Sequence, residues 1–228
     1  MTQTTTHQPV RTGRPFPPPR AWALAGVCAP LLSFIGVHVM HPPGAPEHMT
    51  DAQVVDWITP DAGRIVAGGS LGLISCMLLL LFARGWYGQL VGWGAPHWAA
   101  GLADTSITVA AAVLGVGALL QVTAGLTSLP SEATGQPSLA ATLVNLYGPL
   151  AVGAWVLLAP AVLAGLCTIR RGPRWAALLS MVGSLALVLC LALPPVSWAV
   201  AGAWLLAVSL GCLATSTQRG RESEIPGR

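Results

Sequence analysis

The side chains best suited to bind a metal ion lie close together in one short stretch of the chain. His38, Met40, His41 and His48 all fall between residues 38 and 48. Imidazole and thioether groups are a ligand set that suits copper. The order His-x-Met-His is nevertheless no established metal signature, and the prolines at 42, 43 and 46 leave the local geometry open. We expect these residues to be polar groups at a membrane interface, with a metal site as the alternative.

Asp104 is a second candidate, because an ionisable residue inside an apolar segment is a functional hypothesis by default. It could act as a proton-relay carboxylate. Thr105 and Ser106 follow it directly, as at the beginning of a helix. We therefore prefer a helix-start carboxylate that the helix dipole stabilises.

Four polar residues, with His38 again among them, are expected at a similar depth near the outer ends of their apolar segments. They are His38, Arg64, Gln121 and Asn145. Hydrogen bonds between helices would account for them. The alternative is a polar pocket that faces outward. Asp61 precedes Arg64 by three residues, and this spacing predicts an ion pair across one helical turn.

Signs of catalysis are weak elsewhere in the chain. The sequence contains neither an H-E-x-x-H motif nor a P-loop, and no Ser/His/Asp or Cys/His arrangement can be argued from it. Its five cysteines form no C-x-x-C pair, which argues against a disulfide framework or a zinc site. We expect no cofactor. An enzyme on this scaffold would act on lipids at the outer face, with His38 or His41 as the base.

Composition places the chain in the membrane. Hydrophobic residues make up 54% of it and charged residues 8%, whereas a soluble domain carries about a quarter charged residues. The run from Ile65 to Phe82 is eighteen residues without a charge, or about 27 Å of helix, close to the thickness of a bilayer core. The net charge of +3 is too small to indicate a nucleic-acid partner. We predict an all-α, polytopic bundle of transmembrane helices.

Six spans are predicted, at about 21–40, 65–83, 104–126, 140–169, 175–193 and 196–215. The long fourth span contains Pro149 and Pro160 and is expected to tilt or break. Residues 1–20 and 216–228 form tails, the first of them rich in proline and expected to be disordered. The aromatic stretch 84–98 is predicted to lie at a membrane interface.

Two short sequence patterns predict further structural features, one between these spans and one within them. Thr50 and Gln53 fit a capping box, which predicts a short helix on the membrane surface that ends before Pro60. Gly68 and Gly72 form a G-x-x-x-G step, which allows a second helix to approach closely.

The arginines set the expected orientation, because cytoplasmic segments are enriched in basic residues. With six spans and a cytoplasmic amino terminus, ten of the eleven arginines face the cytoplasm and only Arg64 lies outside. We therefore place both termini in the cytoplasm. The chain has eleven arginines and no lysine and is rich in alanine, glycine and proline, residues with GC-rich codons. This composition favours a GC-rich bacterial source, so we expect the chain in a bacterial cytoplasmic membrane.

A resemblance to known proteins rests on the pattern of spans, the acidic first outer loop and a basic turn. That turn reads Arg170-Arg171-Gly172-Pro173-Arg174-Trp175 and precedes the fifth span. The chain resembles a group of small six-helix integral membrane proteins of actinobacteria, grouped as domains of unknown function. The resemblance implies a multi-pass membrane protein and carries no activity with it.

From the sequence we expect a non-enzymatic accessory subunit of a membrane complex. Its partners would be the lipid bilayer and another membrane protein. A small-molecule or ion binding or transport protein with the outward-facing polar pocket is the first alternative. A lipid-modifying membrane enzyme is the second.

Overall fold

The computed structural model describes residues 19–39, 50–128, 137–168, 172–190 and 194–223. Every regular element in these ranges is a helix, so the all-α prediction is confirmed. The α-helices are α1 (Pro19–Phe34), α2 (Asp51–Ile58), α3 (Ala62–Gly92), α4 (His97–Thr127), α5 (Pro137–Val156), α6 (Ala159–Leu166), α7 (Arg174–Cys190) and α8 (Pro194–Ser223). A π-helical turn, η1 (Ile35–Val39), continues α1, and a 3-10 turn, η2 (Thr59–Asp61), joins α2 to α3.

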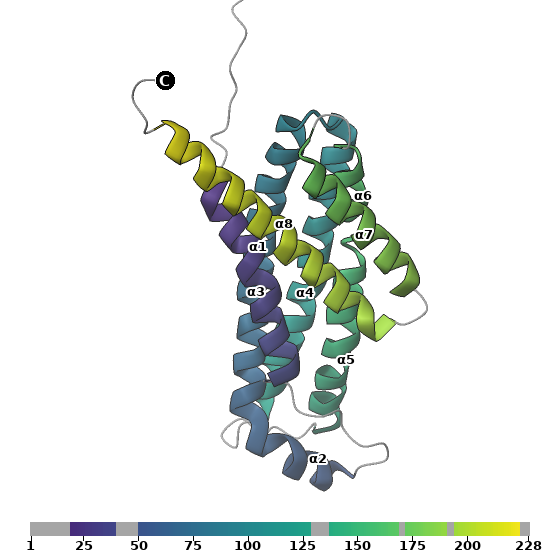
Figure 1. The fold of residues 1–228 in the computed structure, drawn as a ribbon. Coiled ribbons are helices and arrows are strands. Elements are labelled where there is room, and N and C mark those ends of the chain that lie inside the picture. Colours follow the sequence, from purple (N-terminus) through teal and green to yellow (C-terminus); the bar gives the residue numbers. More distant parts are fainter. Residues whose placement is uncertain (1–18, 40–49, 129–136, 169–171, 191–193, 224–228) are drawn as a thin grey trace, which may run out of the picture.

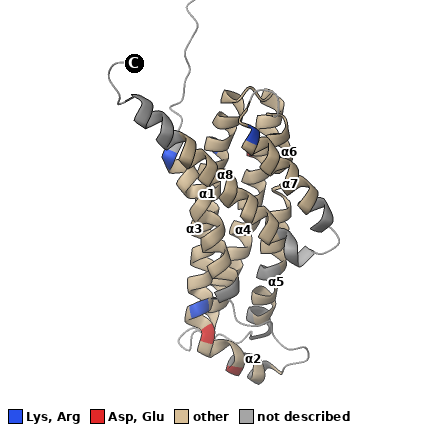
Figure 2. Cartoon of the chain, viewed as in Figure 1, with Lys and Arg blue, Asp and Glu red and all other residues tan. Residues whose placement is uncertain are grey.

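Five stretches of the described residues are long and apolar enough to cross a membrane. They are Arg20–Val37, Asp56–Gly92, His97–Thr127, Ala141–Leu166 and Trp198–Thr215. These correspond to five of the six predicted spans. The sixth candidate is α7, whose seventeen residues correspond to the predicted fifth span. In Figure 2 the charged residues visible in the described part of the chain lie at the two ends of the bundle, with uncharged helix between them.

Helices α3 and α4 form the central hairpin, and both are longer than predicted. Helix α3 continues to Gly92, and α4 begins at His97, directly after Pro96. The turn between them requires a glycine, because Gly94 has a φ of 80° and ends α3 in the left-handed region. Glycines also bring the two helices together. A Cβ at Gly69 would lie 2.7 Å from the carbonyl oxygen of Ala118.

The other helices pack around this hairpin (Figure 1). Helix α1 lies between α3 and α8, α5 and α6 pack on α4, and α7 contacts α6 and α8. The predicted close approach at the G-x-x-x-G step is observed, since a Cβ at Gly36 would lie 2.8 Å from the Gly68 carbonyl oxygen. The predicted fourth span breaks into α5 and α6 at Leu157 and Leu158, because Pro160 has no N–H to continue the helical ladder.

The capping box and the short helix that it begins are both confirmed, while the position of this helix on the membrane surface stays a prediction. The backbone N–H of Thr50 donates to Gln53 Oε1 at 2.9 Å, and that of Gln53 donates to Thr50 Oγ1 at 3.4 Å. Helix α2 ends at Ile58, before Pro60, and lies across one end of the bundle in Figure 1.

The prediction that the aromatic stretch 84–98 lies at an interface is wrong for its central tryptophan. Trp86 is 0% exposed, whereas Trp98 is 69% exposed. The Trp86 ring packs on Phe82 at 6.0 Å between centroids, on Trp93 at 5.7 Å and on Trp204 at 5.8 Å. Helix α3 extends past the predicted end of the span, so this tryptophan fills the core between helices instead of meeting lipid headgroups.

Candidate functional site

The four residues of the expected outer polar set have different environments in the structure. Gln121 is fully buried in α4, while Arg64 and Asn145 are exposed on α3 and α5. The predicted ion pair is confirmed, with Arg64 Nη1 2.9 Å from Asp61 Oδ1. His38 belongs to η1, and its side chain lies outside the described residues. The outward-facing polar pocket therefore stays a prediction.

Apolar side chains fill the bundle near this outer polar level. Ile58, Ile65, Ala124 and Val144, from α2, α3, α4 and α5, form one buried cluster, with Trp57 and Leu143 packed against it. At this end of the bundle, the described side chains therefore make apolar contacts between the helices. The remaining members of the expected metal set, Met40, His41 and His48, lie outside the described residues.

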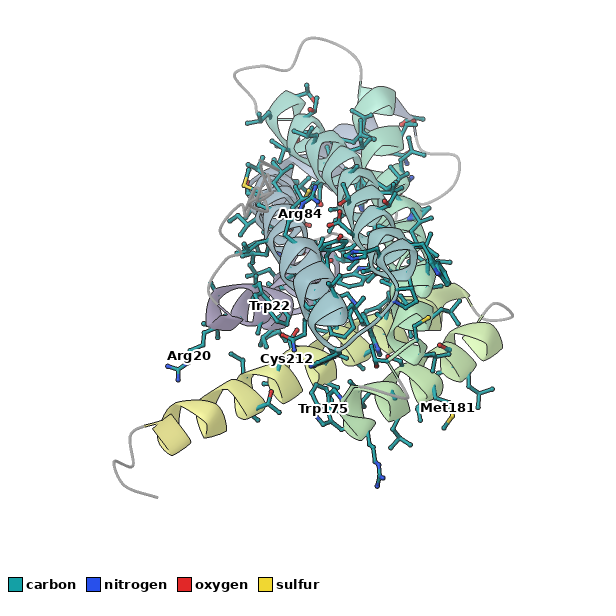
Figure 3. All side chains as sticks on the ribbon, turned by 90° about the horizontal axis from the view of Figure 1, so that it is seen from above. Arg20, Trp22, Arg84, Trp175, Met181 and Cys212 are labelled. Carbon is teal, nitrogen blue, oxygen red and sulfur yellow. The ribbon has the colours of Figure 1, made fainter. Side chains whose placement is uncertain are left out.

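Asp104 does not lie at the start of a helix, so the helix-dipole interpretation is wrong. Helix α4 begins at His97, about two turns earlier, and the dipole effect fades within the first turn. Arg84 on α3 neutralises the carboxylate instead, with its Nη1 2.8 Å from Asp104 Oδ2. Figure 3 shows Arg84 between α3 and α4, whereas Arg20 and Met181 point away from the bundle.

An apolar cavity between α1, α5 and α8 is the candidate ligand site that the described residues form. Its volume is about 370 Å³. Ligand sites in proteins are typically clefts or cavities of 300–1,000 Å³ with mostly apolar and aromatic walls. The wall consists of Pro30, Leu31, Ser33, Phe34, Val37, Ala151, Val152, Trp155, Trp198, Ala199, Gly202, Ala203 and Leu206.

The paths of the helices explain why this space stays open. Figure 1 shows α8 crossing the bundle obliquely, so that its first half diverges from the second half of α1. Small residues on α8 and α5 leave the gap unfilled. A Cβ at Gly202 would meet only Pro30 Cβ, at an ordinary contact distance of 3.6 Å.

The α1 side of the cavity contains an irregular stretch of helix. Pro30 lies inside α1, and the π-helical turn η1 begins at Ile35. Proline removes a backbone hydrogen bond, and π-helical turns are frequent at functional sites. The altered helical path carries Val37 into the cavity wall.

Three aromatic rings give the cavity its shape. Phe34 and Trp198 pack together with ring centroids 5.5 Å apart and an interplanar angle of 31°. Trp155 lies on α5 and is 5% exposed. Aromatic side chains of this kind provide large, rigid apolar surfaces.

Ser33 supplies a hydroxyl to this otherwise apolar wall. It is 2% exposed and lines the cavity. A helical serine commonly donates to the carbonyl four residues earlier, which here belongs to Ala29. That carbonyl accepts a hydrogen bond of 2.8 Å from Ser75 Oγ on α3. Among the residues that line the cavity, Ser33 provides the one hydroxyl.

The sequence interpretation missed this site because its residues come from three distant segments. Pro30, Trp155 and Trp198 belong to three different predicted spans and form no motif in the sequence. The one usable signal was the combination of a proline and a phenylalanine within one apolar span.

Comparison with protein-family models, with curated proteins and with solved structures found no match to this chain.

Proposed function

We propose that this protein binds a lipid-soluble small molecule inside the membrane, in the cavity between α1, α5 and α8. The observation that carries the proposal is an apolar cavity of about 370 Å³ walled by three aromatic rings. An empty apolar cavity of 150 Å³ already binds benzene, so this larger one can hold a bigger molecule. We further propose the bacterial cytoplasmic membrane as its location, with both termini inside.

The position of the cavity supports a ligand that arrives through lipid. Leu31 and Phe34 line it and are 48% and 43% exposed. Both belong to a helix apolar enough to cross a membrane. The opening therefore faces the surroundings of the bundle at membrane depth, where a molecule dissolved in the bilayer can enter.

The proposal can be tested by measuring dye binding to a variant in which a larger side chain fills the cavity. The probe is N-phenyl-1-naphthylamine, an apolar dye that becomes fluorescent in apolar surroundings, titrated into protein in lipid nanodiscs. Ala199 is exposed and lines the cavity, so Ala199→Trp should abolish the saturable part of the signal with little effect on folding. Ala112 is also exposed but lies on α4, away from the cavity, so Ala112→Trp is the matched control and should bind normally. Equal binding in both variants would contradict the proposal.

A role as an accessory subunit of a membrane complex is the second proposal, and the surface of α4 supports it. Between Leu102 and Leu126, the exposed residues of this helix recur at alternating steps of three and four: Leu102, Thr105, Val109, Ala112, Val116, Leu119, Thr123 and Leu126. This spacing is that of a seam between two supercoiled helices. A single partner helix could therefore follow α4 from end to end.

The same two variants separate the two proposals, because Ala199→Trp should affect only ligand binding and Ala112→Trp only partner binding. Purification in mild detergent, followed by mass spectrometry, would reveal a stoichiometric partner protein. Ala112→Trp should displace that partner and leave the cavity intact, whereas Ala199→Trp should keep the partner. A protein that purifies alone from its native membrane would argue against the accessory role.

A further inference from the structure

We infer that the ligand of the cavity carries a planar ring with an oxygen atom, which the rings of Phe34, Trp155 and Trp198 hold and the Ser33 hydroxyl recognises. The inference rests on the proposed function and adds the chemical class of the ligand. A quinone-like ring dissolved in the bilayer has this chemistry. An unbranched acyl chain or a helix of a partner protein does not.

The aromatic walls favour a flat ring over a flexible chain. Phe34 on α1 and Trp198 on α8 pack at 31° to each other and form one aromatic side of the cavity. Trp155 contributes a third ring from α5. Aromatic rings attract other rings beyond the area that they bury, by offset stacking or edge-to-face contact. A saturated chain gains only the free energy that comes from the apolar area it buries.

The buried hydroxyl favours a ligand that bears an oxygen. Ser33 is 2% exposed and lines the cavity, and the Ala29 carbonyl one turn earlier already accepts one hydrogen bond, from Ser75. A buried polar group without a partner is unfavourable, and at membrane depth no bulk water can provide one. A ligand oxygen within the cavity would accept a hydrogen bond from Ser33 Oγ. A ring that lacks such an oxygen would offer this hydroxyl no hydrogen bond.

The experiment compares two probes that differ only in their oxygens. Menadione is a methylnaphthalene ring with two carbonyl groups, and 2-methylnaphthalene is the same ring without them. Saturable quenching of tryptophan fluorescence measures menadione binding to the protein in nanodiscs, with empty nanodiscs as the reference. Displacement of menadione then gives the affinities of 2-methylnaphthalene and of dodecane.

We expect menadione to bind about tenfold more tightly than 2-methylnaphthalene, as one hydrogen bond would provide. Ser33→Ala should remove this difference, because it should weaken the binding of menadione and leave the affinity for 2-methylnaphthalene unchanged. Ser70→Ala is the matched control, because the Ser70 hydroxyl bonds to the Val66 carbonyl of its own helix at 2.8 Å and lies outside the cavity. Melting temperatures of the variants verify that each is folded.

The outcomes separate this inference from the proposed function. If both rings bind equally and Ser33→Ala changes neither affinity, the oxygen-recognition inference is wrong while the cavity remains a binding site. If dodecane displaces menadione as well as 2-methylnaphthalene does, the ring preference is wrong. If no probe binds and Ala199→Trp changes nothing, the proposed function itself fails.

Discussion

Arg84 on α3 and Asp104 on α4 form an ion pair of 2.8 Å between residues twenty positions apart in the sequence. The two side chains are unequal partners. Arg84 is 69% exposed, whereas Asp104 is 14% exposed. The second carboxylate oxygen of Asp104, Oδ1, is buried and has no hydrogen-bond partner among the described residues. The pair therefore explains how helix α4 can hold a carboxylate two turns from its beginning.

The unequal burial predicts unequal effects of removing each partner. Arg84→Ala leaves a mostly buried carboxylate unpaired, which should lower the free energy of unfolding by about 1–3 kcal/mol. Asp104→Asn leaves an arginine that is already exposed, at a cost of about 1 kcal/mol or less. Thermal unfolding in detergent provides the measurement. The double variant Arg84→Ala/Asp104→Ala should be more stable than Arg84→Ala alone, and equal losses from both single variants would contradict the prediction.

Gly85 is predicted to be intolerant of alanine. A Cβ at this position would overlap the base of the Trp22 side chain, which is 3% exposed and packs on Phe82 at 5.8 Å. The ring has no free space to move into, so Gly85→Ala should lower the melting temperature by several degrees. Gly101→Ala is the control, because nothing lies within 4 Å of its added Cβ. Since alanine favours helix, this variant should be neutral or more stable.

The hydrogen bond from Ser75 to Ala29 joins α3 to α1 at 2.8 Å. Bonds of this kind between transmembrane helices contribute about 0.6 kcal/mol on average and 1.7 kcal/mol at most. Ser75 is 0% exposed, so Ser75→Ala should fall within that range of destabilisation. Ser70→Ala is the matched control on the same helix, because its hydroxyl bonds locally to Val66. The prediction fails if the two variants unfold at the same denaturant concentration.

Reporter fusions can count the spans. With six crossings, a fusion after Gly135 should report the outside, and fusions after Gly172 and Arg221 should both report the cytoplasm. Helix α7 is the critical element, because its seventeen residues make it the shortest candidate span. If α7 did not cross the membrane, Gly172 and Arg221 would lie on opposite sides. A cytoplasmic signal at Gly135 would contradict the six-span topology earlier in the chain.

The sequence alone determined the features that depend on neighbouring residues. Apolar runs predicted the helices, because a helix in lipid must satisfy its own backbone hydrogen bonds whatever surrounds it. The Thr50–Gln53 capping box and the Asp61–Arg64 pair followed from three-residue spacing on a helix. The fourth span was expected to tilt or break because it contains Pro149 and Pro160, and it breaks beside Pro160, whereas α5 continues through Pro149.

Only the tertiary structure decided which apolar surfaces face one another. Membrane helices are apolar all round, so hydropathy does not distinguish a ring that meets lipid from one that meets another helix. Trp86 was therefore predicted at an interface and is buried, and Asp104 was assigned to a helix start and is paired with Arg84. The cavity depends on the angle at which α8 crosses α1. At this crossing Pro30 of α1 lies close to Gly202 of α8, and the two residues are far apart in the chain.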